Sequence, residues 1–422
     1  MFTNTYLPHV GGVARSVSSY EEEFRRRGHE VCVVAPEYDG AEESPHVLRT
    51  PAIQKFNGSD FSVRIPQPGL IADFLNDFRP EILHSHHPFL LGDAALRAAW
   101  TRKLPLAFTH HTLYEQYTRY MPLDSKALER VAIQISSEYC NLCTQVIAPS
   151  ESIAELLRQR CVKTPIAAIP TGINLELFAG GDGAAFRRRF GIKPRALVVG
   201  HVGRLAGEKN LEYLSRAVGR FLAVRSDAVF LVVGAGDEED VVQQTAADAA
   251  SSEQVVMAGS QTGQDLADAY AAMNVFAFSS QSETQGMVLA EAMAARTPVV
   301  ALDGPGVREV VNDRNGRLLP GDASEDQFAA ALSEVAGDRA RLRRLGAAAQ
   351  RSAKPFGIEA CADRMLALYG TLIEQYAHRE TDPGLWERFL SRVEIEWNLL
   401  VEKTTALSAA VVETDATRSH LD

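Results

Sequence analysis

Residues 196–210 are ALVVGHVGRLAGEKN, and this stretch decides the fold of the second half of the chain. Its first seven residues form a mostly apolar run of strand length, which is typical of a strand buried on both faces. A glycine-containing turn follows directly, and a helical pattern begins after Asn210. The stretch therefore predicts a strand, a loop and a helix, which is the repeating unit of a parallel α/β sheet.

The same alternation of short apolar runs and helical segments continues through both halves of the chain. Val13, Val17, Tyr20 and Phe24 recur at helical spacing, and an apolar run follows them at residues 31–35. Strands that alternate with helices favour a parallel sheet covered by helices on both faces. We therefore predict an α/β protein with two Rossmann-like doubly wound domains that face each other across a cleft.

A Pro- and Gly-rich passage at residues 170–194 interrupts this alternation, and we place the domain boundary inside it. The predicted domains are residues 1–178 and residues 179–355. Residues 356–378 are predicted to form a carboxy-terminal helix, and residues 379–422 an amphipathic helix with a frayed tail.

The composition is that of a folded globular protein, since 46% of the 422 residues are apolar and 23% are charged. Lys and Arg total 43 against 54 Asp and Glu, and the net charge of -11 argues against nucleic acid as a ligand. No apolar run reaches the roughly 18 residues of a bilayer span, and no export signal is visible. We expect a cytoplasmic protein, and we leave open whether it attaches to the inner face of the membrane.

Two basic residues follow the strand at residues 196–202, in the place where doubly wound sheets bind ligands. Arg204 and Lys209 supply two positive charges, which suit a diphosphate. A P-loop is excluded, because it would need a Ser or Thr at Asn210.

A second informative stretch, residues 282–293, is SETQGMVLAEAM. Gly286 lies at a predicted turn from a strand into a helix. The amides of Met287, Val288 and Leu289 would begin this helix without backbone partners, and such amides suit a phosphate.

Two carboxylates flank this turn and are candidates for binding sugar hydroxyls. Glu283 precedes the turn and Glu291 lies inside the helix, so each would reach a different part of one extended ligand. The alternative is that Glu283 only stabilises the helix start and that Glu291 is solvated. The spacing alone does not separate these two interpretations.

With these residues in place, the chain resembles the retaining GT-B glycosyltransferases of family 4, which use nucleotide-sugar donors. The similarity covers nearly all of residues 1–375, and its segments are weak singly but specific together and in order. They are Pro8–Val13 with its Gly-Gly loop, Thr109–Thr112, Ile169–Asn174, Gly203–Leu205 with Lys209, Glu283–Glu291 and Asn315–Gly316. The resemblance implies the GT-B fold, with the helix at residues 356–378 crossing back to the first domain.

The resemblance also implies roles for these residues. Arg204 and Lys209 would hold the donor diphosphate. Glu283 would contact the hydroxyls of the donor sugar, and Glu291 would bind the nucleotide ribose. His111 would lie beside the transferred sugar as an orienting group rather than a compulsory base. A same-face substitution is the favoured route, in which the leaving phosphate accepts the proton of the acceptor hydroxyl.

The remaining donor-binding candidates are Gly12, Gly259, Gly286, Met287 and Val288. Gly12 would let the backbone of the first domain approach the diphosphate, and Gly259 would lie near the base. The donor would be a UDP- or GDP-linked sugar, and we expect no other cofactor.

The histidines allow a metal-site alternative. His84 and His86 point the same way on a predicted strand, and His87, His110 and His111 follow nearby. No His-Glu-x-x-His motif or paired-cysteine ligand set accompanies them, so a zinc hydrolase is disfavoured and no metal is expected.

Residues 84–92 and 110–121 look like those of the family branch that glycosylates diacylglycerol or related membrane lipids. The acceptor-side candidates are His86, His87, Tyr114 and Tyr117, although the tyrosines would equally suit an ordinary loop and helix face. The predicted function is retaining hexosyl transfer to a hydroxyl of a lipid or amphiphilic acceptor. A soluble sugar or sugar phosphate is the alternative acceptor, and a non-catalytic nucleotide-sugar-binding protein is the alternative function.

Overall fold

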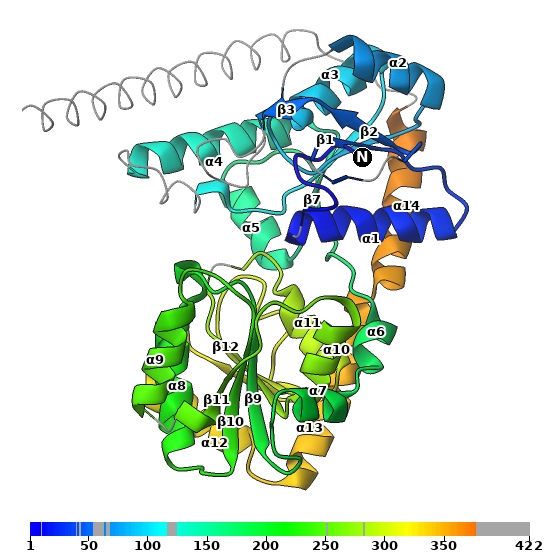
Figure 1. Cartoon of the computed structure of the whole chain (residues 1–422). Helices are drawn as coiled ribbons and strands as arrows, with labels where there is room; N and C mark the ends of the chain where they lie inside the picture. The colour runs from blue at the N-terminus through cyan, green and yellow to red at the C-terminus, as the bar shows by residue number, and fades with distance from the viewer. Residues whose placement is uncertain are drawn as a thin grey trace, which may run out of the picture.

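The computed structural model describes residues 1–9, 11–38, 40–41, 44–53, 63–64, 68–115, 125–249, 252–281 and 283–376. They form two lobes, one above the other in Figure 1, with the amino-terminal half of the chain in the upper lobe. The predictions for Tyr117 and for residues 379–422 lie outside the described residues.

The amino-terminal lobe is built on a parallel sheet. Its strands are β1 (Val33–Pro36), β2 (Val47–Thr50), β5 (Leu83–Ser85), β6 (Leu106–Thr109), β7 (Gln145–Ala148) and β8 (Ile166–Ala168), with a small antiparallel pair β3 (Ala52–Ile53) and β4 (Val63–Arg64). Its helices are α1 (Gly12–Arg26), α2 (Pro68–Phe78), α3 (Leu91–Arg102), α4 (Ser125–Leu142) and α5 (Glu151–Gln159). Phe2 bridges in parallel to Val34 of β1 and to Ser85 of β5. The first residues of the chain therefore lie between β2-β1 and β5-β6-β7-β8 and join them into one sheet.

The carboxy-terminal lobe is a six-stranded sheet in the order β11-β10-β9-β12-β13-β14, and every pair is parallel. The strands are β9 (Leu197–Val202), β10 (Ala228–Val233), β11 (Val255–Met257), β12 (Val275–Phe278), β13 (Val299–Leu302) and β14 (Gly316–Leu319). The helices are α6 (Leu175–Ala179), α7 (Gly183–Arg189), α8 (Leu211–Ala223), α9 (Glu239–Ala249), α10 (Gly263–Ala272), α11 (Met287–Ala294), α12 (Glu325–Val335) and α13 (Arg339–Ala353). The first strand, β9, lies inside the sheet and the chain winds outward on both sides, which confirms the predicted doubly wound fold.

Both faces of this sheet are buried, which explains why its strands are almost continuously apolar. Val198 belongs to the core formed with α10 and α11, which includes Tyr270 and Met293. The next residue, Val199, belongs to the opposite core, formed with α8 and α12. Successive side chains of β9 therefore enter different cores, as the two-residue period of a strand requires.

Two segments of the chain cross between the lobes side by side. Ile173 follows β8, and its amide donates to the carbonyl of Phe356 while its carbonyl accepts from the amide of Ile358, both at 2.9 Å. An added Cβ at Gly172 would lie 2.4 Å from Cα of Ile358, so only glycine allows this approach.

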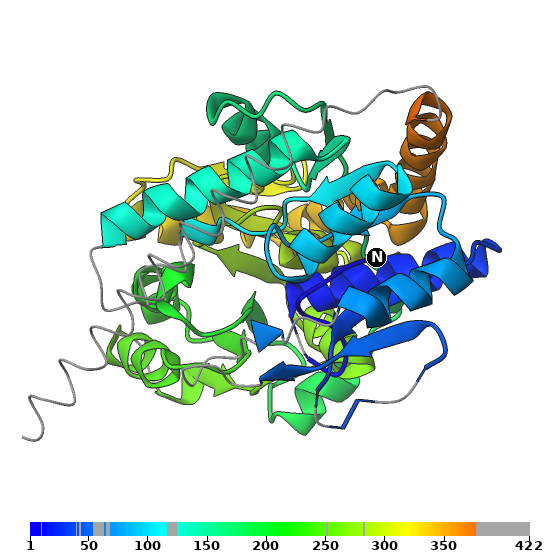
Figure 2. The same cartoon turned by 90° about the horizontal axis from the view of Figure 1, so that it is seen from above.

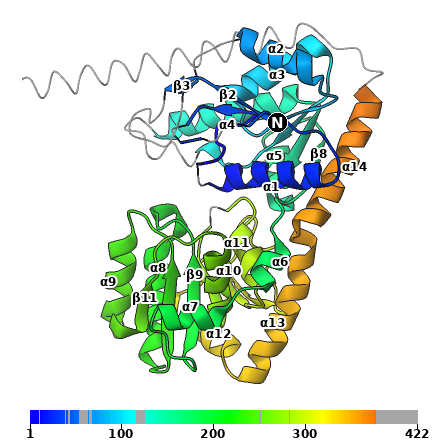
Figure 3. The ribbon, with the colours of Figure 1, turned by 45° about the vertical axis from the view of Figure 1, so that its right-hand side comes forward.

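The last described helix, α14 (Ile358–Tyr376), runs from this crossing along the amino-terminal lobe. Figures 2 and 3 show it at one edge of the molecule, and in Figure 3 it runs up beside the amino-terminal lobe. Its residues Met365 and Tyr369 share a core with Tyr20 and Phe24 of α1. The chain therefore folds back onto the lobe where it began.

Candidate active site

Lys209 and Glu283 lie together at the carboxyl ends of two neighbouring strands. Lys209 ends the short 3₁₀ turn after β9, and Glu283 follows β12. Nζ of Lys209 donates to Oε1 of Glu283 at 2.5 Å, and roughly a fifth of each side chain is exposed. The sheet brings residues 74 positions apart into contact because β9 and β12 are adjacent. A ligand can reach both charges.

Arg204 lies on the same loop and is the more exposed cation. Its guanidinium pairs with the carboxylate of Glu208, and 58% of its side chain is exposed. The long guanidinium side chain can turn toward a bound anion because solvent surrounds most of it.

A buried histidine that the sequence prediction missed lies beneath this loop. His201 is 1% exposed in β9, and its Nδ1 is 3.2 Å from the carbonyl oxygen of Ala277. Its Nε2 has no hydrogen-bond partner in the part of the chain that the structure describes. Burial lowers the pKa of His201 to about 4, so the ring is neutral at pH 7. The one sequence signal for it was a single polar residue inside an apolar strand.

Gly286 turns the chain from the Glu283 loop into α11. Its φ of +68° is left-handed, and an added Cβ would also lie 2.8 Å from Cδ1 of Leu289. The prediction that the first three amides of the helix lack partners is wrong for Leu289, whose amide donates to the Gly286 carbonyl at 2.9 Å. This is the tight i to i−3 bond common at helix ends. The candidate phosphate donors are therefore the amides of Met287 and Val288.

Glu291 is buried inside α11 at 1% exposure, which excludes the solvated alternative. Its Oε1 accepts from Nη1 of Arg15 at 3.0 Å, and its Oε2 accepts from the hydroxyl of Tyr270 at 2.7 Å. Burial raises the pKa of Glu291, and the charge of Arg15 and the hydrogen bonds from both partners oppose that rise. Arg15 belongs to α1, so this ion pair joins the two lobes.

The sequence prediction missed Arg15 and Tyr270 as partners of Glu291. Arg15 lies one helical turn after Gly12. That spacing puts it on the side of α1 that Gly12 occupies, which is the only signal for it in the sequence. Tyr270 carries no signal, because its spacing is that of an ordinary core residue.

His86 and His111 meet at the carboxyl ends of β5 and β6. Nδ1 of His86 lies 2.9 Å from Nε2 of His111. His84 packs against His86 with ring centroids 4.1 Å apart. The two nitrogens of His84 contact the hydroxyl of Thr109 at 2.7 Å and that of Tyr369 at 2.5 Å. His86 thus orients His111. His86 in turn packs on His84, whose ring contacts Tyr369 of α14.

Burial lowers the pKa of each of these histidines. The pKa of His111 falls to about 3 and that of His110 to about 4. His87, whose Nδ1 accepts from the amide of Asn4 at 3.1 Å, has a pKa lowered to about 3. At pH 7 all of these rings are neutral, so they can orient a substrate by hydrogen bonds but are weak bases.

Of the two predicted acceptor-side tyrosines, Tyr114 is the one that the structure describes. Its ring packs edge-on against Phe89, with centroids 5.2 Å apart, and against His110 at 5.7 Å. Next to it, Glu115 accepts from Nη2 of Arg160 at 2.6 Å. Tyr114 therefore sits in an aromatic cluster beside an ion pair.

Gly12 lies at the start of α1, whereas Gly259 lies on the loop after β11. Gly12 begins α1, and an added Cβ there would meet Cε of Met287 at 3.7 Å. The start of α1 therefore faces the start of α11 across the gap between the lobes. Gly259 has a left-handed φ of +65°, and its carbonyl accepts from the amide of Gly234 at 2.9 Å.

The loop after Glu283 contacts the amino-terminal lobe directly. The Thr284 hydroxyl donates to the carbonyl of His111 at 2.9 Å, and the Thr284 carbonyl accepts from the hydroxyl of Ser150 at 2.7 Å. The side chain of Gln285 makes two hydrogen bonds to the main chain of Thr171. Glu283 and His111, predicted from separate motifs, are thus connected through the intervening Thr284.

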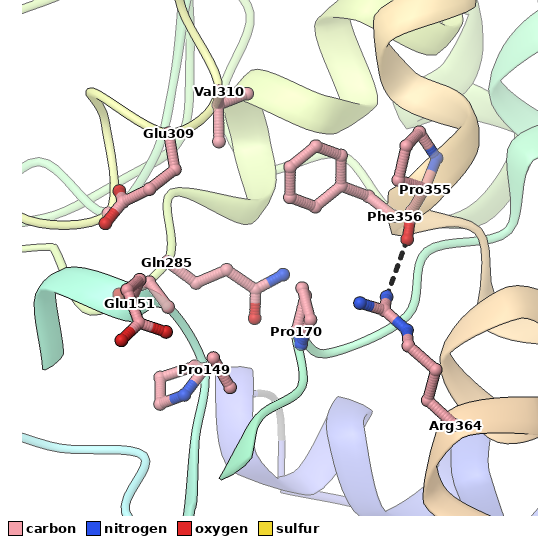
Figure 4. Close-up of a pocket in the computed structure, with 12 residues that line it drawn as sticks. Pro149, Glu151, Pro170, Gln285, Glu309, Val310, Pro355, Phe356 and Arg364 are labelled. Carbon is pink, nitrogen blue, oxygen red and sulfur yellow. Dashed lines mark hydrogen bonds between the residues drawn. The ribbon is translucent and has the colours of Figure 1, made fainter. Parts of the chain in front are cut away.

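A cavity of about 170 Å³ lies between the lobes beside this loop. In Figure 4, Gln285 projects among its lining residues, with Glu151 and Glu309 on one side and Arg364 on the other. The guanidinium of Arg364 donates to the carbonyl of Pro355 at 2.8 Å. None of the residues that line this cavity is a predicted site residue, so it is distinct from the Lys209–Glu283 site.

Among the residues with described positions, no group of three or more His, Cys, Asp or Glu side chains is arranged to hold a metal ion. The described helices also include none with the length and apolar character needed to cross a membrane.

Comparisons with known proteins match both lobes. Residues 10–177 match the family Glycosyltransferase Family 4, and residues 182–352 match Glycosyl transferases group 1. The chain is 26% identical to an alpha-monoglucosyldiacylglycerol synthase of Acholeplasma laidlawii, over 89% of this chain and 97% of the relative. It is 30% identical to a GDP-mannose-dependent alpha-mannosyltransferase of Mycolicibacterium smegmatis, over 82% of this chain and 90% of the relative.

Two further comparisons extend this result. The chain is 31% identical to a D-inositol 3-phosphate glycosyltransferase of Stackebrandtia nassauensis, over 70% of this chain and 69% of the relative. Its fold is similar to that of a sucrose-phosphate synthase from Thermosynechococcus elongatus, with a TM-score of 0.71 and 22% identity over 89% of this chain and 99% of the other.

Proposed function

This chain belongs to the GT-B glycosyltransferases of family 4, and from that premise we propose that it transfers a hexose, with retention, from a nucleoside diphosphate sugar to a hydroxyl of a lipid or amphiphilic acceptor. The observation that supports this most is a chain of three contacts. Lys209 holds Glu283, the adjacent Thr284 holds the carbonyl of His111, and His86 holds the His111 ring. These contacts connect a cation and a carboxylate of one lobe to the main chain of His111 in the other lobe, which supports a shared site.

The donor diphosphate would bind to Arg204, Lys209 and the amides at the start of α11. A diphosphate competes with Glu283 for the Lys209 ammonium, since both are anionic oxygen acceptors. Once Lys209 turns to the phosphate, the carboxylate of Glu283 is released to accept hydrogen bonds from sugar hydroxyls. The cations and the helix dipole then oppose the charge that develops on the leaving diphosphate.

The nucleotide ribose would bind to Glu291. A carboxylate accepts from two neighbouring hydroxyls through both oxygens, and Glu291 already directs one oxygen to Arg15 and the other to Tyr270. The ribose hydroxyls would share or replace these donors. Donor binding would therefore alter an ion pair that links the lobes.

In the transfer step, the bond between C1 of the sugar and the diphosphate oxygen breaks, and the acceptor oxygen forms a bond to C1 on the same face. The acceptor proton passes to the leaving diphosphate oxygen. His111 orients the sugar as a neutral hydrogen-bonding group, which agrees with its low pKa. No residue is assigned as a nucleophile.

Diacylglycerol is the favoured acceptor class. The name of the relative from A. laidlawii includes a glucosylated diacylglycerol, and Tyr114 and Phe89 form an aromatic pair that suits an amphiphile. A sugar phosphate is the second candidate, because a relative with higher identity is named D-inositol 3-phosphate glycosyltransferase.

The test supplies UDP-glucose or GDP-mannose with either diacylglycerol vesicles or inositol 1-phosphate and inositol 3-phosphate, and identifies products by mass spectrometry. A glycolipid with an α-anomeric proton coupling in its NMR spectrum is the expected product. A glycosylated inositol phosphate would select the second acceptor instead. An inverted anomer would overturn retention.

Donor turnover without acceptor separates an enzyme from a binding protein. We expect slow release of UDP or GDP from the matching donor in water. A protein that binds UDP or GDP but releases neither from its sugar, with or without acceptor, would be the non-catalytic alternative.

A further inference from the structure

The loop that follows Glu283 is held by four hydrogen bonds from the other lobe. The Thr284 hydroxyl donates to the His111 carbonyl at 2.9 Å, and the Ser150 hydroxyl donates to the Thr284 carbonyl at 2.7 Å. The amide of Thr171 donates to Oε1 of Gln285 at 2.6 Å, and Nε2 of Gln285 donates to the Thr171 carbonyl at 2.8 Å. We call Ser150, Thr171, Thr284 and Gln285 the interlobe clamp.

The clamp reaches three separate parts of the amino-terminal lobe. His111 follows β6, Ser150 is the N-cap of α5, and Thr171 lies in the crossing segment after β8. Gln285 and Thr171 are 5% and 6% exposed. Buried hydrogen bonds are protected from water and have fixed geometry, so the position of the loop depends on contact between the lobes.

The loop is also backed closely by its own lobe. Gly306 has a left-handed φ of +72°, and an added Cβ there would lie 2.6 Å from the amide nitrogen of Gln285. The loop thus packs closely against its own, carboxy-terminal lobe and makes directional hydrogen bonds to the amino-terminal lobe. The neighbouring cavity of about 170 Å³ shows that the lobes are not packed continuously here. The hydrogen bonds of the clamp therefore fix the position of the loop against the amino-terminal lobe.

We propose that Thr284 and Gln285 are positioning residues that set the carboxylate of Glu283 against His111 when the lobes come together. The proposal rests on the proposed function, in which Glu283 and His111 flank the transferred sugar. Thr284 is covalently next to Glu283 and donates to the main-chain carbonyl of His111, so it limits the distance between these two residues. Gln285 fixes the same loop to the crossing segment, so it transmits lobe closure to Glu283.

The test compares Thr284→Val and Gln285→Leu, which remove the hydrogen bonds at nearly constant volume, with Thr284→Ser, which keeps the hydroxyl. Thr371→Val is the matched control, because its hydroxyl donates within α14, to the carbonyl of Ala367, on an exposed surface. UDP-glucose and GDP-mannose are the probes, and release of UDP or GDP gives kcat and KM separately. Melting curves verify that each variant is folded.

We expect Thr284→Val and Gln285→Leu each to lower kcat roughly three- to tenfold, the range for losing one or two hydrogen bonds. The donor KM should change less than about twofold, because the cations and Glu291 are untouched. Thr284→Ser should retain most of kcat, and Thr371→Val should match the wild type. Unchanged kcat in both clamp variants, or a loss confined to KM, would overturn the proposal.

A scattering measurement keeps the proposal separate from the proposed function. If the wild type neither binds UDP or GDP nor turns over their sugars, the proposed function fails. The clamp is still tested by the radius of gyration in solution, which should increase when Thr284→Val and Gln285→Leu are combined. An unchanged radius of gyration in the folded double variant would refute the claim that the clamp holds the lobes together. If the double variant does not fold, the two single variants are measured in its place.

Discussion

At the scale of single residues, Lys209 and Glu283 form an ion pair with each other in the site that we propose for the donor diphosphate. Their contact at 2.5 Å is partly exposed, so solvent screens it and its net stabilisation is small. A diphosphate with two negative groups offers Lys209 a stronger partner. The pair is therefore better suited to exchange ligands than to hold the fold together.

Replacing either member should separate donor binding from chemistry. Lys209→Met should weaken UDP or GDP binding by roughly 10- to 100-fold, the loss expected for a hydrogen bond to a charged group. Glu283→Gln should bind the nucleotide about as well as the wild type and lose roughly 100-fold in kcat, since the carboxylate acts on the sugar. Isothermal titration and turnover measure the two effects. Lys193→Met, which replaces an exposed lysine, is the control. If Lys209→Met left UDP and GDP binding unchanged, this donor site would be excluded.

Glu291 shows how a buried carboxyl is kept ionisable by a residue from another lobe. Burial raises its pKa above the ordinary 4.5, and Arg15 and Tyr270 counter that rise. A group with a raised folded-state pKa stabilises the fold below its unfolded pKa, and this contribution is lost as pH rises through the folded-state pKa. Removing Arg15 raises the pKa further and extends the loss to higher pH.

Arg15→Met should therefore destabilise the protein in a pH-dependent way. We expect a deficit in unfolding free energy of about 1–3 kcal/mol at pH 7.5, and a smaller deficit at pH 5, where the Glu291 carboxyl binds a proton more readily. Urea unfolding at several pH values measures it. Arg188→Met on the exposed face of α7 should show no such pH dependence. A deficit that grows toward low pH would contradict this account of Glu291.

At the scale of elements, α14 is the helix that fastens the two lobes. It begins at the crossing where Ile173 pairs with Phe356 and Ile358, and its buried face then joins the core of α1. It also carries Tyr369, whose hydroxyl contacts His84 in the histidine group. A helix that contains none of the predicted site residues therefore supports the histidine group that contacts His111.

Truncating a buried side chain of α14 should lower the free energy of unfolding. Met365 is 1% exposed, so Met365→Ala leaves a cavity and should cost about 2–5 kcal/mol in unfolding free energy. Gln375→Ala, on the exposed face of the same helix, should cost less than about 0.5 kcal/mol. Denaturant unfolding compares them, and equal midpoints would show that α14 does not pack as described.

At the scale of the whole molecule, the relation between the lobes depends on two chain segments that run side by side. Gly172 lets them approach, because any side chain there would meet the backbone of Ile358. The interlobe clamp and the Arg15–Glu291 pair add polar contacts between the lobes. Both are short polar contacts, which a rotation of one lobe against the other would break.

Gly172→Ala should force the crossing segments apart. We expect a loss of about 1–3 kcal/mol in unfolding free energy from overpacking, together with a larger radius of gyration in solution. Gly370→Ala in α14 is the matched control, because an added Cβ there meets nothing within 4 Å and should stabilise the helix by roughly 0.5–1 kcal/mol. If Gly172→Ala were as stable and compact as that control, the close crossing would be refuted.

The sequence by itself determined the two doubly wound sheets, because strands buried on both faces must be almost continuously apolar and helices must carry an apolar stripe. It also determined the turn at Gly286, which requires a left-handed residue, and it singled out Arg204, Lys209, Glu283 and Glu291 as candidates by charge and position. These features are local, so the pattern of neighbouring residues is enough to predict them.

Only the tertiary structure decided which groups meet. It brought Lys209 to Glu283, buried Glu291 between Arg15 and Tyr270, placed His201 beneath the site, and connected Glu283 to His111 through Thr284. Each contact joins segments far apart in the chain, across neighbouring strands or between the lobes. Such a contact depends on strand order and on the packing of one lobe against the other. Neither leaves a period or a local motif in the residues themselves.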